Sequence, residues 1–182
     1  MSVYYPSDSC DGGADYAYNC NPCPTLEYGR IRSIFFKKTS YTFTDPTNPV
    51  EWTSAINSGD VIVLWSTQGS YDGGATSELV GYGDSATING STVHTLIFKD
   101  PNYAENCDFY NGKRQSSSWE AGYRTSSKIH FTGAPVTITP KNPVADDDKS
   151  IVVWETQLKW TNPDSPCPYA TPAGIFDSCY IS

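Results

Sequence analysis

The feature that most restricts the fold is a long segment near the C-terminus in which apolar and polar residues alternate. Within residues 150–160, Trp154, Leu158 and Trp160 occupy alternate positions, with polar residues such as Glu155 between them. Successive side chains of a β-strand point to opposite faces, so this period of two places the apolar set on one face of a sheet. The pattern predicts a strand in an antiparallel sheet that buries one face in a core.

Composition extends this prediction to the whole chain. Among the 182 residues, Val and Ile total 21, whereas Leu contributes 5 and Met 1. Ser and Thr contribute 39 and Tyr 13. β-Branched and aromatic residues favour strands, while Leu, Met, Ala, Glu and Lys favour helices. A helical bundle is thereby excluded, and we expect an all-β protein: a β-sandwich of the jelly-roll or Ig-like type.

One short helix is expected within this fold, near residues 49–58. Asn48 is suited to cap it, and Glu51, three residues later, to reach back to the cap. Trp52 begins an apolar face with helical spacing, and Gly59 ends the run.

The rest of the chain is predicted as strands separated by irregular segments. Asn89-Gly90 is a strong signal for a hairpin turn. A long Gly-rich loop is expected at 68–84 and a second irregular region at 100–118. The remaining predicted strands are 31–36, 41–43, 60–66, 85–88, 92–98, 128–131 and 135–139.

Residues 1–28 differ from the rest of the chain. They contain five Tyr and three Cys, but no Lys or Arg, and show no strand or helix period. Such a segment cannot form a core of its own, so we expect an extended arm that lies against other surfaces. The predicted domains are the Cys/Tyr-rich arm, 1–28, and a β-sandwich body with an ordered C-terminal tail, 29–182.

The six cysteines allow three interpretations. Cys20 and Cys23 have the spacing of half a zinc ribbon, with Cys10 as a further ligand, but no second pair of that spacing exists. Disulfides that fix the arm and the tail are the favoured interpretation, and buried reduced thiols are the remaining one. The disulfide candidates are Cys10, Cys20, Cys23, Cys107, Cys167 and Cys179.

Catalytic patterns are sparse. The two histidines, His94 and His130, both fall in predicted strands, and neither has a recognisable partner nearby in sequence. The segment 83–85 resembles a hydrolase nucleophile block, but the Asp expected shortly before His130 is missing. The acidic run 146–148 lacks the alternating spacing of a calcium loop. We therefore expect a non-enzymatic protein with no cofactor and no bound metal.

Charge argues against nucleic acid as a partner. The chain has 20 acidic and 12 basic residues, a formal net charge of -8, which repels phosphate. Its densest basic cluster, Arg30, Arg32, Lys37 and Lys38, is too small to override this. No apolar run reaches the roughly 18–20 residues of a bilayer span, so no membrane partner is expected.

Sugar binding is a further class to weigh, because exposed aromatic side chains on a β-scaffold can stack on sugar rings. Trp52, Trp65, Trp154 and Trp160 fall on predicted apolar faces, which leaves Trp119 free for such a role.

The start of the sequence bears on location. It has no basic and apolar leader, although the Thr-, Ser- and Tyr-rich composition is typical of extracellular proteins. Virion components released by lysis combine both properties. We expect synthesis in the host cytoplasm without a signal peptide and residence in the virion.

Several segments carry a family resemblance. The segments are Gly29–Phe36, Ser40–Trp52, Gly69–Gly74, Asp100–Tyr103 and Pro140–Asp146. Together they resemble small structural proteins of tailed phages that infect Bacteroidota, including crAss-like phages, over most of residues 20–180. The resemblance implies a virion structural protein: a capsid auxiliary, decoration or head-associated component that stabilises the particle. The major capsid protein and other virion proteins are the implied partners.

Two further expectations concern the assembly of the protein and an alternative function. We expect a homo-oligomer or capsid-docked subunit in which the arm and the segment 68–84 supply contacts. The alternative is a carbohydrate-binding or host-adhesion module of a phage fibre or tail, which would bind glycans selectively.

Overall fold

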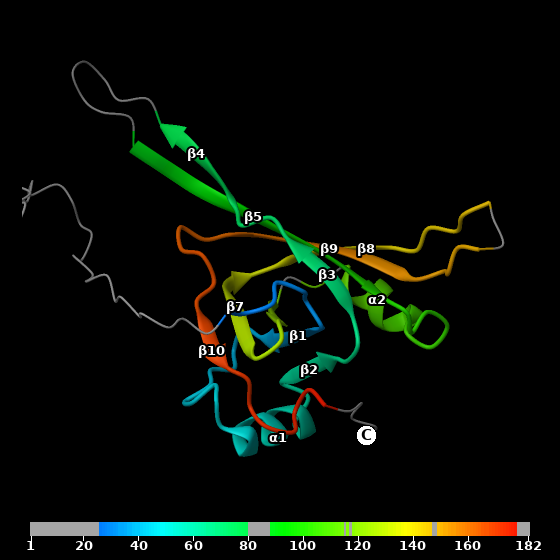
Figure 1. The fold of residues 1–182 in the computed structure, drawn as a ribbon, viewed down its shortest axis with the longest axis horizontal. Helices are drawn as coiled ribbons and strands as arrows, with labels where there is room; N and C mark the ends of the chain where they lie inside the picture. The colour runs from blue at the N-terminus through cyan, green and yellow to red at the C-terminus, as the bar shows by residue number, and fades with distance from the viewer. Residues whose placement is uncertain (1–25, 80–87, 115, 117, 147–148, 178–182) are drawn as a thin grey trace, which may run out of the picture.

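The computed structural model confirms the expected all-β sandwich. Two antiparallel sheets pack face to face, and two short helices lie outside them (Figure 1). Neither helix in the described part of the chain is long and apolar enough to cross a membrane. The structure describes residues 26–79, 88–114, 116, 118–146 and 149–177.

Sheet 1 has the strand order β10-β7-β6-β1-β2. Its strands are β1 (Ser33–Lys38), β2 (Val61–Leu64), β6 (Trp119–Arg124), β7 (Lys128–Pro135) and β10 (Pro168–Ala170). Gly122 in β6 has no side chain where the ring of Phe35 crosses it. A Cβ atom there would collide with that ring and with the backbone carbonyl of His130, so this position requires glycine.

Sheet 2 has the order β3-β5-β9-β8, and β4 pairs with the N-terminal half of β5. Its strands are β3 (Gln68–Tyr71), β4 (Ala75–Leu79), β5 (Ile88–Asp100), β8 (Thr137–Lys141) and β9 (Trp154–Thr161). The alternation predicted for the last strand is confirmed from Trp154 on: Trp154, Leu158 and Trp160 are buried, while Lys159 is exposed. Residues 150–153, predicted as the start of this strand, lie outside it.

The predicted loop at 68–84 is wrong in its first part, because β3 and β4 lie within it. The two strands run in the same direction along β5: Tyr71 pairs with Leu96 and Ala75 with Val93, so residues 72–74 stand opposite only two residues of β5. Gly73 and Gly74 both have positive φ angles, so the glycines mark a local interruption of one sheet edge and not a continuous loop. Residues 80–84 lie outside the described residues.

The hairpin turn predicted at Asn89-Gly90 is also wrong. Both residues lie inside β5, where the register with β4 shifts and Gly90 and Ser91 stand opposite Ser77. Two residues opposite one make a β-bulge, another position that favours glycine. The connection between the two strands falls in 80–87, outside the described residues.

The helix α1 (Pro49–Asn57) confirms the predicted helix. The Asn48 side chain accepts a hydrogen bond from the backbone N–H of Val50 at 3.0 Å. The Glu51 carboxylate reaches past this cap and accepts from the backbone N–H groups of Thr44 and Asp45, at 2.7 and 2.9 Å. The expected bond from Glu51 to the cap is therefore replaced by bonds that fix the preceding loop.

A second helix, α2 (Cys107–Lys113), lies in the segment predicted to be irregular. It spans 7 residues, too short for a helical period to be visible in sequence. The buried Tyr110 holds it to sheet 2, since its hydroxyl donates to the Asp100 carboxylate at 2.7 Å.

Sheet 1 is covered on both faces. The inter-sheet core lies between the two sheets, and Ile34 and Phe36 of β1 point into it. The outer core lies between sheet 1, α1 and the C-terminal segment, and Phe35 of β1 points into it. The predicted strand at 41–43 is not formed; Tyr41 and Phe43 pack at the edge of the outer core instead.

Candidate functional site

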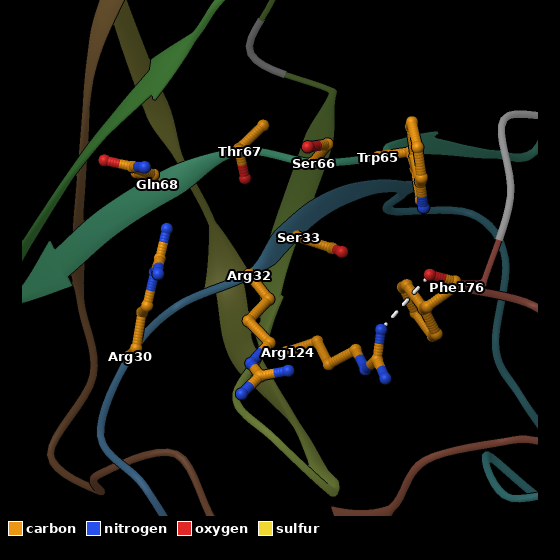
Figure 2. Close-up of a pocket in the computed structure, with 9 residues that line it drawn as sticks. All are labelled: Arg30, Arg32, Ser33, Trp65, Ser66, Thr67, Gln68, Arg124 and Phe176. Carbon is orange, nitrogen blue, oxygen red and sulfur yellow. Dashed lines mark hydrogen bonds between the residues drawn. The ribbon is translucent and has the colours of Figure 1, made fainter.

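A hollow of about 360 Å³ opens beside the turn that joins β2 to β3 (Figure 2). Three of the chain's four arginines line it: Arg30, Arg32 and Arg124. The exposed indole of Trp65 and the ring of Phe176 complete its wall. The hollow is therefore positively charged, although the whole chain has a formal net charge of -8.

The strand period and the pairing of β1 with β6 bring the arginines together. Arg30 and Arg32 flank Ile31, which is 2% exposed and bridges to Gly69 of β3. Because Ile31 points inward, both neighbours point outward. Arg124 ends β6, and its carbonyl accepts a hydrogen bond from the backbone N–H of Arg32 at 2.9 Å.

The guanidinium groups of this hollow have few partners. Arg124 donates from Nη1 to the carbonyl of Phe176 at 3.1 Å, and its Nη2 lies 3.9 Å from a carboxylate oxygen of the exposed Asp177. Its buried Nε has no hydrogen-bond partner. Among the described residues, no carboxylate lies within ion-pair distance of Arg30 or Arg32.

The β2–β3 turn supplies the polar edge of the hollow. Ser66 has a φ angle of +63°, the only positive value at a residue other than glycine in the described part of the chain. This left-handed conformation is unfavourable for an L-residue with a side chain. Thr67, which follows it, is 3% exposed, and its hydroxyl has no hydrogen-bond partner. Figure 2 shows the Arg30 guanidinium directed toward the segment that carries Thr67 and Gln68.

Sequence reasoning missed this hollow and placed the tryptophans differently. Trp65 was assigned to an apolar face but is 41% exposed. Trp119 was assigned as the free tryptophan but is half-buried, with the Lys113 ammonium 3.3 Å from the centre of its ring. The available signal was the alternation of Arg30 and Arg32 around Ile31.

The basic cluster noted in the sequence is divided by the fold. Lys37 is buried, contacts the Glu120 carboxylate at 3.1 Å and donates to the carbonyl of Tyr41 at 2.6 Å. Lys38 pairs with Asp60 at 3.0 Å. These lysines are neutralised within the fold, whereas the two arginines of the cluster face the hollow.

The two histidines are part of the packing. His94 is fully buried; its Nδ1 lies 2.7 Å from the Tyr71 hydroxyl and its Nε2 lies 2.9 Å from the carbonyl of Asn162. His130 stacks on Tyr123 with ring centres 4.6 Å apart, and burial lowers the pKa of its imidazole. Both residues lie in strands, as predicted.

The described cysteines are not joined in a disulfide. Cys107 and Cys167 are exposed and free. Across the described ranges, no cluster of His, Cys, Asp or Glu is suited to hold a metal ion. Both the disulfide interpretation and the zinc alternative stay predictions, since Cys10, Cys20, Cys23 and Cys179 lie outside the described residues.

A second candidate surface is the two-stranded ribbon made by β4 and residues 88–92 of β5. Pairing of β5 with β9 ends at Val93 and Thr161, so this part of β5 has β4 as its partner strand among the described residues. Figure 1 shows the ribbon projecting away from the sandwich. Thr76 and Glu78 of β4 are exposed.

The end of the predicted arm is anchored by Glu27. Its carboxylate accepts four hydrogen bonds from the turn between β6 and β7: from the hydroxyls of Thr125, Ser126 and Ser127 and from the backbone N–H of Ser127, at 2.6–2.8 Å. These bonds hold the pKa of Glu27 well below its usual range. Residues 1–25 of the arm lie outside the described residues.

Comparison with known proteins identifies no relative. The chain matches no protein-family model, no curated protein and no solved structure.

Proposed function

We propose that the protein is a non-enzymatic structural component of a phage virion, a capsid auxiliary or other head-associated subunit. In this role it joins neighbouring virion proteins through the β4–β5 ribbon. The observation that carries the proposal is the projection of this ribbon beyond the sandwich. An isolated two-stranded hairpin is only marginally stable in water, so a projecting ribbon is well suited to gain a strand from a partner.

The composition of the ribbon supports this role. Sheet edges that must stay unpaired are usually protected by charged residues, especially lysine, by proline, by bulges or by very short strands. The strand β4, ATSEL, has one charged residue, Glu78, and no lysine or proline, and the extra residue of the bulge lies on β5 and not on this edge. Thr76 and Thr92 are hydrogen-bonded across the ribbon through their hydroxyls, 2.9 Å apart. The edge is therefore polar enough to remain exposed to water before assembly. It has few of the features that prevent an edge strand from pairing with a strand of a partner protein.

Two further observations support a structural role. The imidazole of His94 is fully buried, with both ring nitrogens in contact with hydrogen-bonding groups, which suits packing rather than proton transfer to a substrate. The sequence resemblance supports the virion setting and the major capsid protein as a partner. The expectation of a homo-oligomer or capsid-docked subunit comes from the N-terminal arm and stays part of this proposal.

The test is incorporation into particles of the encoding phage, measured as copies per virion by quantitative mass spectrometry. Thr76→Lys places a charge on β4, the outer strand of the ribbon, and should reduce incorporation at least tenfold. Thr139→Lys makes the same change at an exposed position of β8, the opposite edge strand of sheet 2, and should incorporate like the unmodified chain. Circular dichroism confirms that both variants fold. Equal incorporation of the two variants, or absence of the unmodified chain from virions, would contradict the proposal.

The second candidate function is a host-adhesion or carbohydrate-binding module, favoured by the exposed Trp65 beside the arginine-lined hollow. A glycan array distinguishes the two roles. A protein with only a structural role should bind no glycan selectively, whereas an adhesion module should bind a defined set.

A further inference from the structure

The arginine-lined hollow has an excess of positive charge that the described residues do not neutralise. Arg30, Arg32 and Arg124 line the same space, and among the described residues Asp177 makes the one ion-pair contact to them, at 3.9 Å. Arg30 and Arg32 are exposed, and the Arg124 side chain is 17% exposed. An anion bound among them would gain attraction from all three charges, most of it from the partly buried Arg124. Arginine does not lose its proton at ordinary pH, so all three charges persist.

Of the five buried side-chain atoms that lack a hydrogen-bond partner among the described residues, two lie in the hollow. The hydroxyl of Thr67 belongs to a side chain almost entirely removed from solvent, and the Nε of Arg124 is buried as well. Buried donors are nearly always paired in native proteins, so each unpaired one requires an explanation. The left-handed Ser66 places strain in the same turn, and strain of this kind is concentrated at binding sites.

The remaining lining residues favour an organic anion over a simple ion. Trp65 presents an exposed indole, and Ser33 and Gln68 add a hydroxyl and an amide to the wall. The volume, about 360 Å³, is within the range of small-molecule sites. Aromatic faces contact the C–H face of a sugar ring, while hydroxyls and amides pair with its hydroxyl groups.

We propose that this hollow binds a sugar carrying a carboxylate, such as a uronic or sialic acid residue. The arginines bind the carboxylate, because the planar guanidinium matches its two oxygens, and Trp65 contacts the ring. The proposal rests on the second candidate function, the carbohydrate-binding one, and specifies its ligand class. The site is separate from the ribbon, so the proposal does not depend on the role in assembly.

The test is isothermal titration calorimetry on the full chain at low salt. The probes are glucuronate and N-acetylneuraminate, with glucose, acetate and inorganic phosphate for comparison. One or both sugar acids should bind at least tenfold more tightly than glucose or acetate. Binding of no probe overturns the proposal, as does equal binding of acetate, which indicates a plain anion site, or tighter binding of phosphate.

Variants assign the binding to the hollow. Arg32→Gln should weaken binding of the sugar acid at least tenfold. Arg114→Gln is the matched control, because Arg114 is the one arginine outside the hollow, and it should leave the affinity unchanged. Trp65→Ala should weaken the sugar acid but not acetate. Equal loss in both arginine variants, at unchanged melting temperature, overturns the assignment. Incorporation of Arg32→Gln into particles is expected to be normal, which separates this test from that of the structural role.

Discussion

The outer core and the inter-sheet core cover opposite faces of the same sheet, yet they are built from different chemistry. The outer core is aromatic, with Phe35 at the centre of contacts to Trp52, Phe131 and Phe176. Its indole N–H, on Trp52, donates to the carbonyl of Pro46 at 2.8 Å at the margin of the cluster. The stability of the outer core therefore depends on how completely its aromatic rings fill the space between sheet 1 and α1.

The inter-sheet core includes polar groups among its apolar residues. His94 and Tyr71 are hydrogen-bonded to each other, and Tyr110 is bonded to the buried Asp100. Stability there depends in part on these buried donors and acceptors retaining their partners. Two other buried groups on β9, the Thr156 hydroxyl and the Trp160 indole N–H, have no hydrogen-bond partner among the described residues. The two faces of one sheet should therefore respond to substitution and to pH in different ways.

The largest effect is expected from Phe35→Ala in the outer core. Phe35 is fully buried, and its removal leaves a cavity above Gly122 that the surrounding rings cannot fill. The free energy of unfolding, measured by urea denaturation, should fall by about 3–5 kcal/mol. Phe35→Leu, which keeps most of the volume, should cost clearly less. A loss below about 1 kcal/mol for alanine would show that the outer core contributes little.

A smaller loss is expected from Tyr110→Phe in the inter-sheet core. The change removes one hydroxyl and leaves the carboxylate of Asp100, which is 3% exposed, with the backbone N–H of Asn102 as its remaining partner. Unfolding free energy should fall by about 1–3 kcal/mol, although no cavity of any size is made. Tyr103→Phe is the control, because Tyr103 is exposed, and it should be nearly neutral. Equal losses for Tyr110→Phe and Tyr103→Phe would show that the buried hydrogen bond of Tyr110 does not stabilise the inter-sheet core in particular.

The smallest effect concerns pH. Burial lowers the pKa of His130 below the ordinary value of 6.5, so the unfolded chain binds a proton more readily than the folded one. Stability from this group is complete above pH 6.5 and is lost as pH falls toward the folded pKa. Between pH 7 and 5, unfolding free energy should decrease for the unmodified protein and decrease less for His130→Gln. Parallel curves would show that His130 does not cause the loss. Asp60 and Glu155, whose pKa values are also lowered, act at more acidic pH.

Local patterns were predictable from the sequence, and non-local ones were not. The alternation in β9 and the cap of α1 depend on neighbouring residues, and both were predicted. The exposure of Trp65 depends on where β2 ends and on the left-handed Ser66 that turns the chain toward sheet 2. The continuous apolar run at 61–65 does not show that β2 ends at Leu64, before Trp65.

The arginine-lined hollow was likewise only partly predictable from the sequence. Arg30 and Arg32 could be placed on one face of an extended segment by period alone. Their meeting with Arg124, 92 residues further along than Arg32, depends on the register of β1 with β6, in which Ser33 stands opposite Arg124. The bulge at Gly90 likewise depends on the partner strand, so Asn89-Gly90 resembled a turn when read alone.

The anchored carboxylate of Glu27 has a consequence for the residues that precede it. Its four bonds fix one point of attachment, on the turn at 125–127, and its lowered pKa keeps the anchor ionised through mild acidification. Any contact that residues 1–25 make with this body is then governed by an effective local concentration, set by the length of chain from Glu27. Contacts too weak to hold a free peptide can therefore suffice, and dilution of the protein does not weaken them.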